Sequence, residues 1–69
     1  MNKSLNHYVG RIVRLNKIAF QEIKDRAMRQ GVALENSFLV AEVNRRLKKI
    51  ICYGASFRIE VSLSDVVLV

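Results

Sequence analysis

Four cations within five residues, Arg45, Arg46, Lys48 and Lys49, form the densest charged cluster in the sequence. Guanidinium and ammonium groups gathered in this way bind phosphate oxygens, with an affinity that falls steeply as salt is added. Clusters of this size also occur at solvated turns and helix ends that bind nothing. The whole chain is basic, with a net charge of +6, so the leading functional hypothesis is phosphate binding.

Further candidates for the same surface lie on predicted strands. Arg11, Arg14 and Arg58 would extend the positive field if those strands are neighbours. Tyr53 with Arg58 could stack on an unpaired base, because aromatic and guanidinium planes accept any base, or could be an ordinary cross-strand pair. The sequence thus predicts a non-enzymatic protein that binds nucleic acid with little base specificity. The alternative is a protein-interaction or accessory module whose charge aids encounter with an acidic protein.

Other residue types that do chemistry are isolated in this sequence. Cys52 is the only cysteine and His7 the only histidine, whereas zinc takes three or four protein ligands. A nucleophilic thiol needs a nearby base, so we expect Cys52 to pack in the core. Ser62, Ser64 and Asp65 are typical of a hydrogen-bonding corner. We therefore expect no enzymatic activity, no cofactor and no metal site.

Length and composition limit the molecule that must position these residues. The 69 residues, 51% of them apolar, predict one globular domain over 1–69 in which residues 1–7 are loosely ordered. A chain this short hides only about 60% of the surface that its unfolded form exposes, a shortage that a homodimer would relieve. The lone cysteine and the lack of an apolar signal or a membrane-length apolar run predict a cytoplasmic protein without membrane insertion.

Hydropathy patterns predict a strand followed by a helix. Residues 8–16 (YVGRIVRLN) alternate as in a strand, and Gly10 allows a bend early in it. Residues 17–31 have the period of an amphipathic helix, with Asn16 as its N-cap and Gly31 in the left-handed terminal position. The apolar residues of this helix at spacings of three and four are Phe20, Ile23, Ala27 and Met28.

The C-terminal third predicts a hairpin and a last strand. FRIEV alternates between apolar and charged residues, and Gly54-Ala55 is expected to form a two-residue turn before it. That turn gives a register with Cys52 opposite Phe57, Ile50 opposite Ile59 and Lys49 opposite Glu60. The uncharged VVLV, residues 66–69, is expected to be a strand covered on both faces.

Residues 37–50 fit two structures. As a helix, the segment would be capped by Ser37 and would carry an apolar stripe made of Leu39, Val43, Leu47 and Ile50. As two strands, FLVAEV and KIICY would be joined by a polar loop in which Asn44 tolerates a left-handed backbone. We favour strands, because a run of strands from Phe38 to Val69 gives VVLV partners.

The strand interpretation predicts an α+β, mainly antiparallel protein that resembles an SH3-like small barrel with one inserted amphipathic helix. RAMRQGVALENSFLVAEV followed by FRIEVSLSDVVLV is similar in rhythm to ferrous iron transport protein A domains, which implies an accessory binding module. Those domains usually have Pro-Gly after the helix, where this chain has Leu34-Glu35.

The helix interpretation gives a different likeness. RIVRLN followed by two helices resembles a ribbon-helix-helix DNA-binding protein, here with an added C-terminal hairpin. The resemblance implies that side chains of the ribbon read bases. By position these side chains would be either Arg11, Val13 and Leu15 or Ile12 and Arg14.

Overall fold

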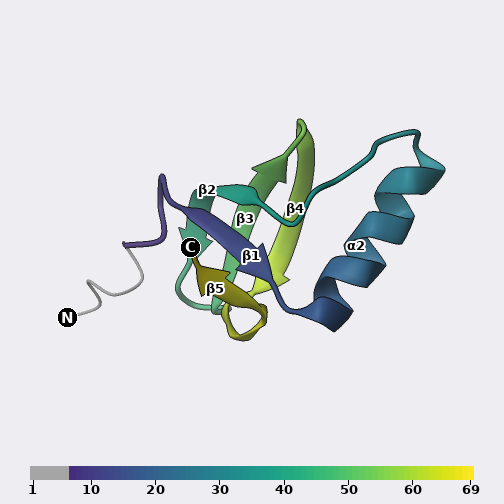
Figure 1. The fold of residues 1–69 in the computed structure, drawn as a ribbon. Helices are drawn as coiled ribbons and strands as arrows, with labels where there is room; N and C mark the ends of the chain where they lie inside the picture. Colours follow the sequence, from purple (N-terminus) through teal and green to yellow (C-terminus); the bar gives the residue numbers. More distant parts are fainter. Residues whose placement is uncertain (1–6) are drawn as a thin grey trace.

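The computed structural model describes residues 7–69 and contains one α-helix and one sheet (Figure 1). The elements are β1 (Ile12–Leu15), α2 (Lys17–Arg29), β2 (Phe38–Asn44), β3 (Lys49–Gly54), β4 (Phe57–Ser62), the 3₁₀ helix η1 (Leu63–Asp65) and β5 (Val66–Leu68). All strand pairs are antiparallel, in the order β4-β3-β2-β1-β5. The predicted α+β class and the extended central segment are confirmed. The helical alternative for residues 37–50, and with it the ribbon-helix-helix resemblance, is wrong.

The sheet does not close into a barrel. β4 and β5 are its two edges, and each pairs on one side only with a described strand. A 3₁₀ turn of three residues, η1, carries the chain from β4 to β5, and β5 pairs with β1 for only three residues. The small antiparallel sheet with one helix fits the expected SH3-like small-barrel fold loosely. Barrel closure was the part of that prediction that is wrong, because β4 and β5 do not pair with each other.

Alternating side chains of the strands form the core on one face of the sheet, the inner face. α2 covers part of this face with Ile23 and Ala27, and the Phe20 ring meets the Phe38 ring edge-on at 6.3 Å between centroids. Cys52 is fully buried there, as the sequence predicted. The largest fully buried side chains are Phe38, Ile50, Ile59, Val13, Val40 and Cys52.

Asn16 fixes the start of the helix and joins it to the C-terminal segment. Its Oδ1 accepts a hydrogen bond from the Ala19 amide over 2.8 Å, which confirms the predicted N-cap. Its Nδ2 donates to Asp65 Oδ1 over 3.0 Å, and its backbone N–H donates to the Asp65 carbonyl over 2.8 Å. These bonds explain why η1 and β5 lie beside the end of β1. At the other end of α2, Gly31 has φ +78, as expected for a left-handed terminal residue.

Asn36 attaches the segment after the helix to β1. Its Oδ1 accepts from the Leu15 amide at 2.8 Å and its Nδ2 donates to the Leu15 carbonyl at 2.9 Å. Replacing Asn36 with Asp keeps the shape but puts a carboxylate oxygen against that carbonyl. We expect the free energy of unfolding in urea to fall by about 1–3 kcal/mol. The control is Gln30→Glu, which adds the same charge at an exposed position and should alter the free energy of unfolding by less than about 0.5 kcal/mol. Equal losses of stability in the two variants would show that the hydrogen bonds of Asn36 have no special role.

The turn of the β3–β4 hairpin lies one residue later than predicted. Ala55 and Ser56 form it with left-handed φ values of 50° and 68°. Gly54 is paired with Phe57 because the glycine packs against Phe38, and a Cβ on it would lie 2.7 Å from that ring. The predicted register was therefore wrong, and the observed pairs include Cys52 with Ile59, Ile50 with Val61 and Lys49 with Ser62.

The prediction that VVLV is covered on both faces is also wrong. Val66 is buried, but Val67 and Val69 are 63% and 64% exposed and Leu68 is 37% exposed. The helix packs on the inner face, so no described element covers the outer face to which Val67 and Val69 point, and β5 has no described neighbour beyond β1. Met28, expected on the apolar stripe of the helix, is likewise exposed, because successive residues of a helix point about 100° apart and Ala27 faces the core. The expected loose ordering of residues 1–7 falls largely outside the described residues.

Candidate nucleic-acid interface

The four cations of the densest cluster lie together at the turn between β2 and β3, which we call the basic turn (Arg45, Arg46, Lys48 and Lys49). Asn44 and Lys49 form the last pair of the ladder, and residues 45–48 connect them. Asn44 Oδ1 accepts a hydrogen bond from the Leu47 amide over 3.1 Å, which holds the turn tight. The left-handed residue is Lys48, with φ 53, and not Asn44 as the sequence suggested.

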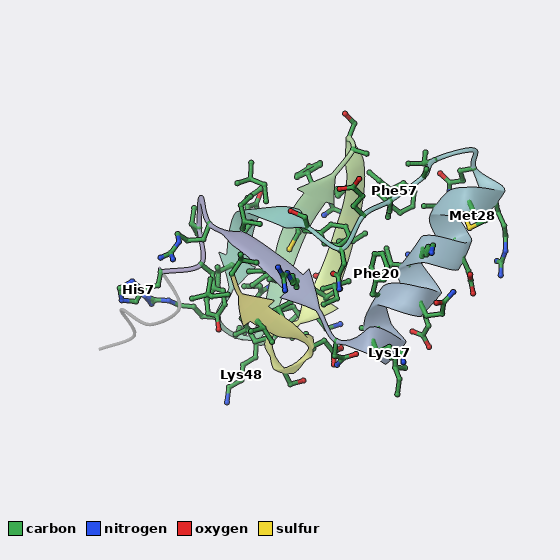
Figure 2. All side chains as sticks on the ribbon, viewed as in Figure 1. His7, Lys17, Phe20, Met28, Lys48 and Phe57 are labelled. Atoms are coloured by element: carbon green, nitrogen blue, oxygen red, sulfur yellow. The ribbon has the colours of Figure 1, made fainter. Side chains whose placement is uncertain are left out.

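All four side chains of the basic turn are exposed to solvent. Figure 2 shows Lys48 extending away from the sheet. No carboxylate occurs between Val43 and Ile50, so the turn has a uniformly positive local charge. Exposed charges of one sign attract a polyanion over about 10 Å at moderate salt, and this attraction weakens as salt rises.

Tyr53 and Arg58 form a second group, on the outer face of the sheet, which is the face opposite the core. They are directly paired across β3 and β4, and Leu39 is opposite Tyr53 on its other side. Tyr53 is 41% exposed, so its ring is accessible beside the Arg58 side chain. This geometry permits the predicted base stacking as well as the plain cross-strand pair.

Two carboxylates separate these groups. Glu42 on β2 and Glu60 on β4 are both opposite Ile51 on β3. On the outer face, Ile51 lies between Tyr53 and Lys49, so the two carboxylates lie between the Tyr53–Arg58 pair and the basic turn. Lys49 is four residues from Tyr53 along β3, about 13 Å at the rise of a strand. Period-2 alternation along β3 and β4 would have predicted this separation from the sequence. It does not predict the face on which Glu42 lies, because the β-bulge between Val40 and Glu42 shifts the alternation along β2.

The remaining candidates, Arg11 and Arg14, lie on the β1 side of the molecule. Arg14 is on the outer face opposite Val67, and Arg11 directly precedes β1. Both are exposed. The structure therefore brings four of the eight candidate residues into one turn and two more into one pair, and it puts Arg14 on β1 and Arg11 directly before that strand.

Other kinds of site find little support in the part of the chain that the structure describes. No group of three or more possible metal ligands occurs among residues 7–69. A hollow of about 440 Å³ lies between the start of α2 and η1, but Asn16 and Asp65 in its wall are bonded to each other. No helix in the described range has the length and apolar character to span a membrane.

Burial raises the pKa of the Cys52 thiol from 9.0 to about 11. The unfolded chain loses this proton at lower pH, so between these values it holds fewer protons than the folded chain and stability falls as pH rises. We expect the free energy of unfolding to fall more steeply across this window in the wild type than in Cys52→Ala, whose side chain cannot ionise. Equal slopes, or native Cys52 reacting with a thiol reagent as fast as the unfolded chain, would contradict this.

Comparisons of the chain with protein-family models, with curated proteins and with solved structures gave no match. The case for a function therefore depends on the residues and geometry of this chain.

Proposed function

We propose that this protein binds nucleic acid without catalysing a reaction, and that the basic turn is the principal contact with the phosphate backbone. The observation that carries the proposal is the concentration of four exposed cations, with no carboxylate among them, on one short turn held by Asn44. Cations on a fixed turn lose less conformational freedom on binding than cations on a flexible tail. Because phosphate contacts carry no sequence information, we expect little base specificity.

Tyr53 and Arg58 are the second part of the proposed site. A single-stranded nucleic acid that follows the outer face from the basic turn would reach them after about 13 Å, two or three nucleotide spacings along an extended strand. The carboxylates Glu42 and Glu60 disfavour phosphate in between, so bases and not phosphates would have to cross that row. Arg11 and Arg14 would assist only a ligand long enough to reach β1.

The test measures binding of labelled mixed-sequence DNA and RNA, single- and double-stranded, by fluorescence anisotropy. If four phosphates are neutralised, the affinity should fall about 100-fold between 50 and 200 mM salt. Changing all four residues of the basic turn to Gln should remove most of this salt dependence and weaken binding in low salt by a similar factor. A wild-type protein that binds none of these ligands in low salt would refute the proposal.

A matched control separates the basic turn from net charge. The helix carries four cations, Lys17, Lys24, Arg26 and Arg29, of which three are exposed and Lys24 is partly buried, with its Nζ 6.0 Å from the centre of the Phe20 ring. Changing these four to Gln removes the same charge from the helix and leaves the basic turn unchanged. We expect this variant to keep most of its affinity. If both variants lose affinity equally, net charge and not the turn is responsible.

A protein-interaction module is the second candidate. Ile12, Leu39 and Tyr53 are opposite one another on adjacent strands, and each is at least 40% exposed. An exposed apolar row is unusual for a polyanion site but normal at a protein interface. Recovery of one stoichiometric protein at moderate salt, after removal of nucleic acid, would favour this candidate over the first.

A further inference from the structure

β5 is an edge strand that lacks the usual protection against pairing with another strand. β1 lies on one side of it, and no described strand lies on the other. Proteins generally protect such edges with charged residues, prolines or bulges. The opposite edge, β4, carries Arg58 and Glu60, both exposed, whereas residues 66–69 contain no charged side chain and no proline. The two edges therefore differ in their readiness to accept a further strand.

The backbone of Leu68 faces this open side. Val69 donates a hydrogen bond to the Ile12 carbonyl over 3.2 Å, and Leu68 is opposite Val13. Bonded and non-bonded pairs alternate along an antiparallel ladder, so the N–H and C=O of Leu68 point away from β1. One donor and one acceptor on the same residue are thus presented to a partner strand.

The side chains around this backbone are apolar. Val67 and Val69 project from the outer face and are 63% and 64% exposed, and Leu68 is 37% exposed. Ile12, on the neighbouring strand opposite Val69, continues the apolar surface at 40% exposure. A partner strand with apolar side chains would remove these groups from water, which stabilises association.

We propose that two copies of this chain associate by antiparallel pairing of β5 with β5. Leu68 exchanges both backbone hydrogen bonds with Leu68 of the second copy, and Val67 lies opposite Val69 of the second copy. Antiparallel pairs are related by a two-fold axis normal to the sheet, so the sheet becomes continuous and both outer faces lie on one side.

The reason that the partner is a second copy is the self-complementarity of residues 66–69, the one stretch of the edge where two basic chains can meet without facing each other's charged side chains. Each chain carries a net charge of +6, so most approaches between two copies are repulsive. Residues 66–69 carry no charged side chain, and the segment is complementary to itself in hydrogen bonding and in apolar character. An interface made by one short strand falls below about 1,200 Å², the size of weak and transient contacts. The dimer is therefore expected to dissociate at tens to hundreds of micromolar.

Sedimentation equilibrium of nucleic-acid-free protein tests this inference. Between about 10 μM and 1 mM, the mass should rise from 7.9 kDa toward twice that value. High salt should favour the dimer because it screens the repulsion between copies, the opposite of its effect on nucleic-acid binding. Amide hydrogen exchange should slow at Leu68 as concentration rises. A monomer mass at every concentration and salt would overturn the proposal.

Two variants test whether the copies associate through pairing of β5 with β5. Leu68→Pro removes the outward N–H and leaves the ladder between β1 and β5 intact, because that N–H does not bond to β1. Val67→Glu puts a carboxylate into the apolar contact; it lies opposite Arg14, so the monomer should tolerate it. It also lowers the net positive charge, so loss of the dimer cannot be due to greater repulsion. We expect both variants to be monomeric at concentrations where the wild type is mostly dimeric.

The matched control is Ile18→Glu, which makes the same charge change at a helix residue that is 77% exposed. It should dimerise at least as well as the wild type. Urea unfolding of each variant checks that the fold is retained, and if Leu68→Pro is unfolded then Val67→Glu alone decides. A dimer that survives the folded variants would overturn the proposal, as would an equal loss in the control.

Discussion

Replacing Phe38 with alanine is expected to lower the free energy of unfolding by about 3–5 kcal/mol. Phe38 is fully buried, lies at the start of β2 between β1 and β3, and meets the Phe20 ring of the helix. Its removal leaves a cavity where the sheet and the helix join. A domain of this size has roughly 3–10 kcal/mol of stability in total, so the variant should be largely unfolded or melt far below the wild type.

Urea unfolding followed by circular dichroism measures this effect, with Leu39→Ala as the control. Leu39 is the next residue in β2 but points to the outer face and is 47% exposed. We expect its truncation to cost less than about 1 kcal/mol. Similar losses for the two variants would mean that the core is not on the face to which Phe38 points.

Gly54→Ala is expected to destabilise the protein by about 1–3 kcal/mol although it adds a single methyl group. The added Cβ would lie 2.7 Å from two carbons of the Phe38 ring and 3.3 Å from the Ser37 carbonyl oxygen. The ring is fully buried and cannot move without displacing other core side chains. The effect should appear as a lower urea midpoint with an unchanged slope.

A double-mutant cycle shows whether the ring is the cause. In a Phe38→Leu background the clash with the ring edge is removed, so Gly54→Ala should cost less than it does in the wild type. The residual cost would report the contact with the Ser37 carbonyl. If the two changes are additive, the close approach of Gly54 to Phe38 does not explain the requirement for glycine.

Elements with a strong local signal could be predicted from the sequence. The helix follows from its apolar spacing and from the Asn16 side chain, and the observed cap bond to Ala19 has the expected partner. The strands at residues 38–44 and 49–54 were only favoured by their β-branched and aromatic residues, since the same segment also fitted a helix, and the pairing of β2 with β3 decides for strands. Burial of Cys52 follows from the preference of a free cysteine for the core, and the structure buries it completely.

Pairing and faces could not be predicted in the same way. A β3–β4 turn at Gly54-Ala55 and one at Ala55-Ser56 put the same residues of both strands on each face of the sheet. Alternation of apolar and polar residues therefore does not distinguish the two registers. Contact between Gly54 and the Phe38 ring, which are 16 residues apart, decides between the two. The arrangement of the candidate site could not be predicted either. The β-bulge after Val40 decides that Glu42 lies between the basic turn and Tyr53.

The sequence by itself determined the helix, the strand character of residues 12–15 and 57–62, the positive charge and the clustering of four cations, because these depend on residues close together in the chain. Only the tertiary structure decided that the sheet stays open, that Tyr53 and Arg58 are separated from the basic turn, and that VVLV is an exposed edge. Those features arise from contacts between distant residues, among them Asn16 with Asp65 and Asn36 with Leu15. Short-range patterns carry no information about which of several compatible partners a strand will meet.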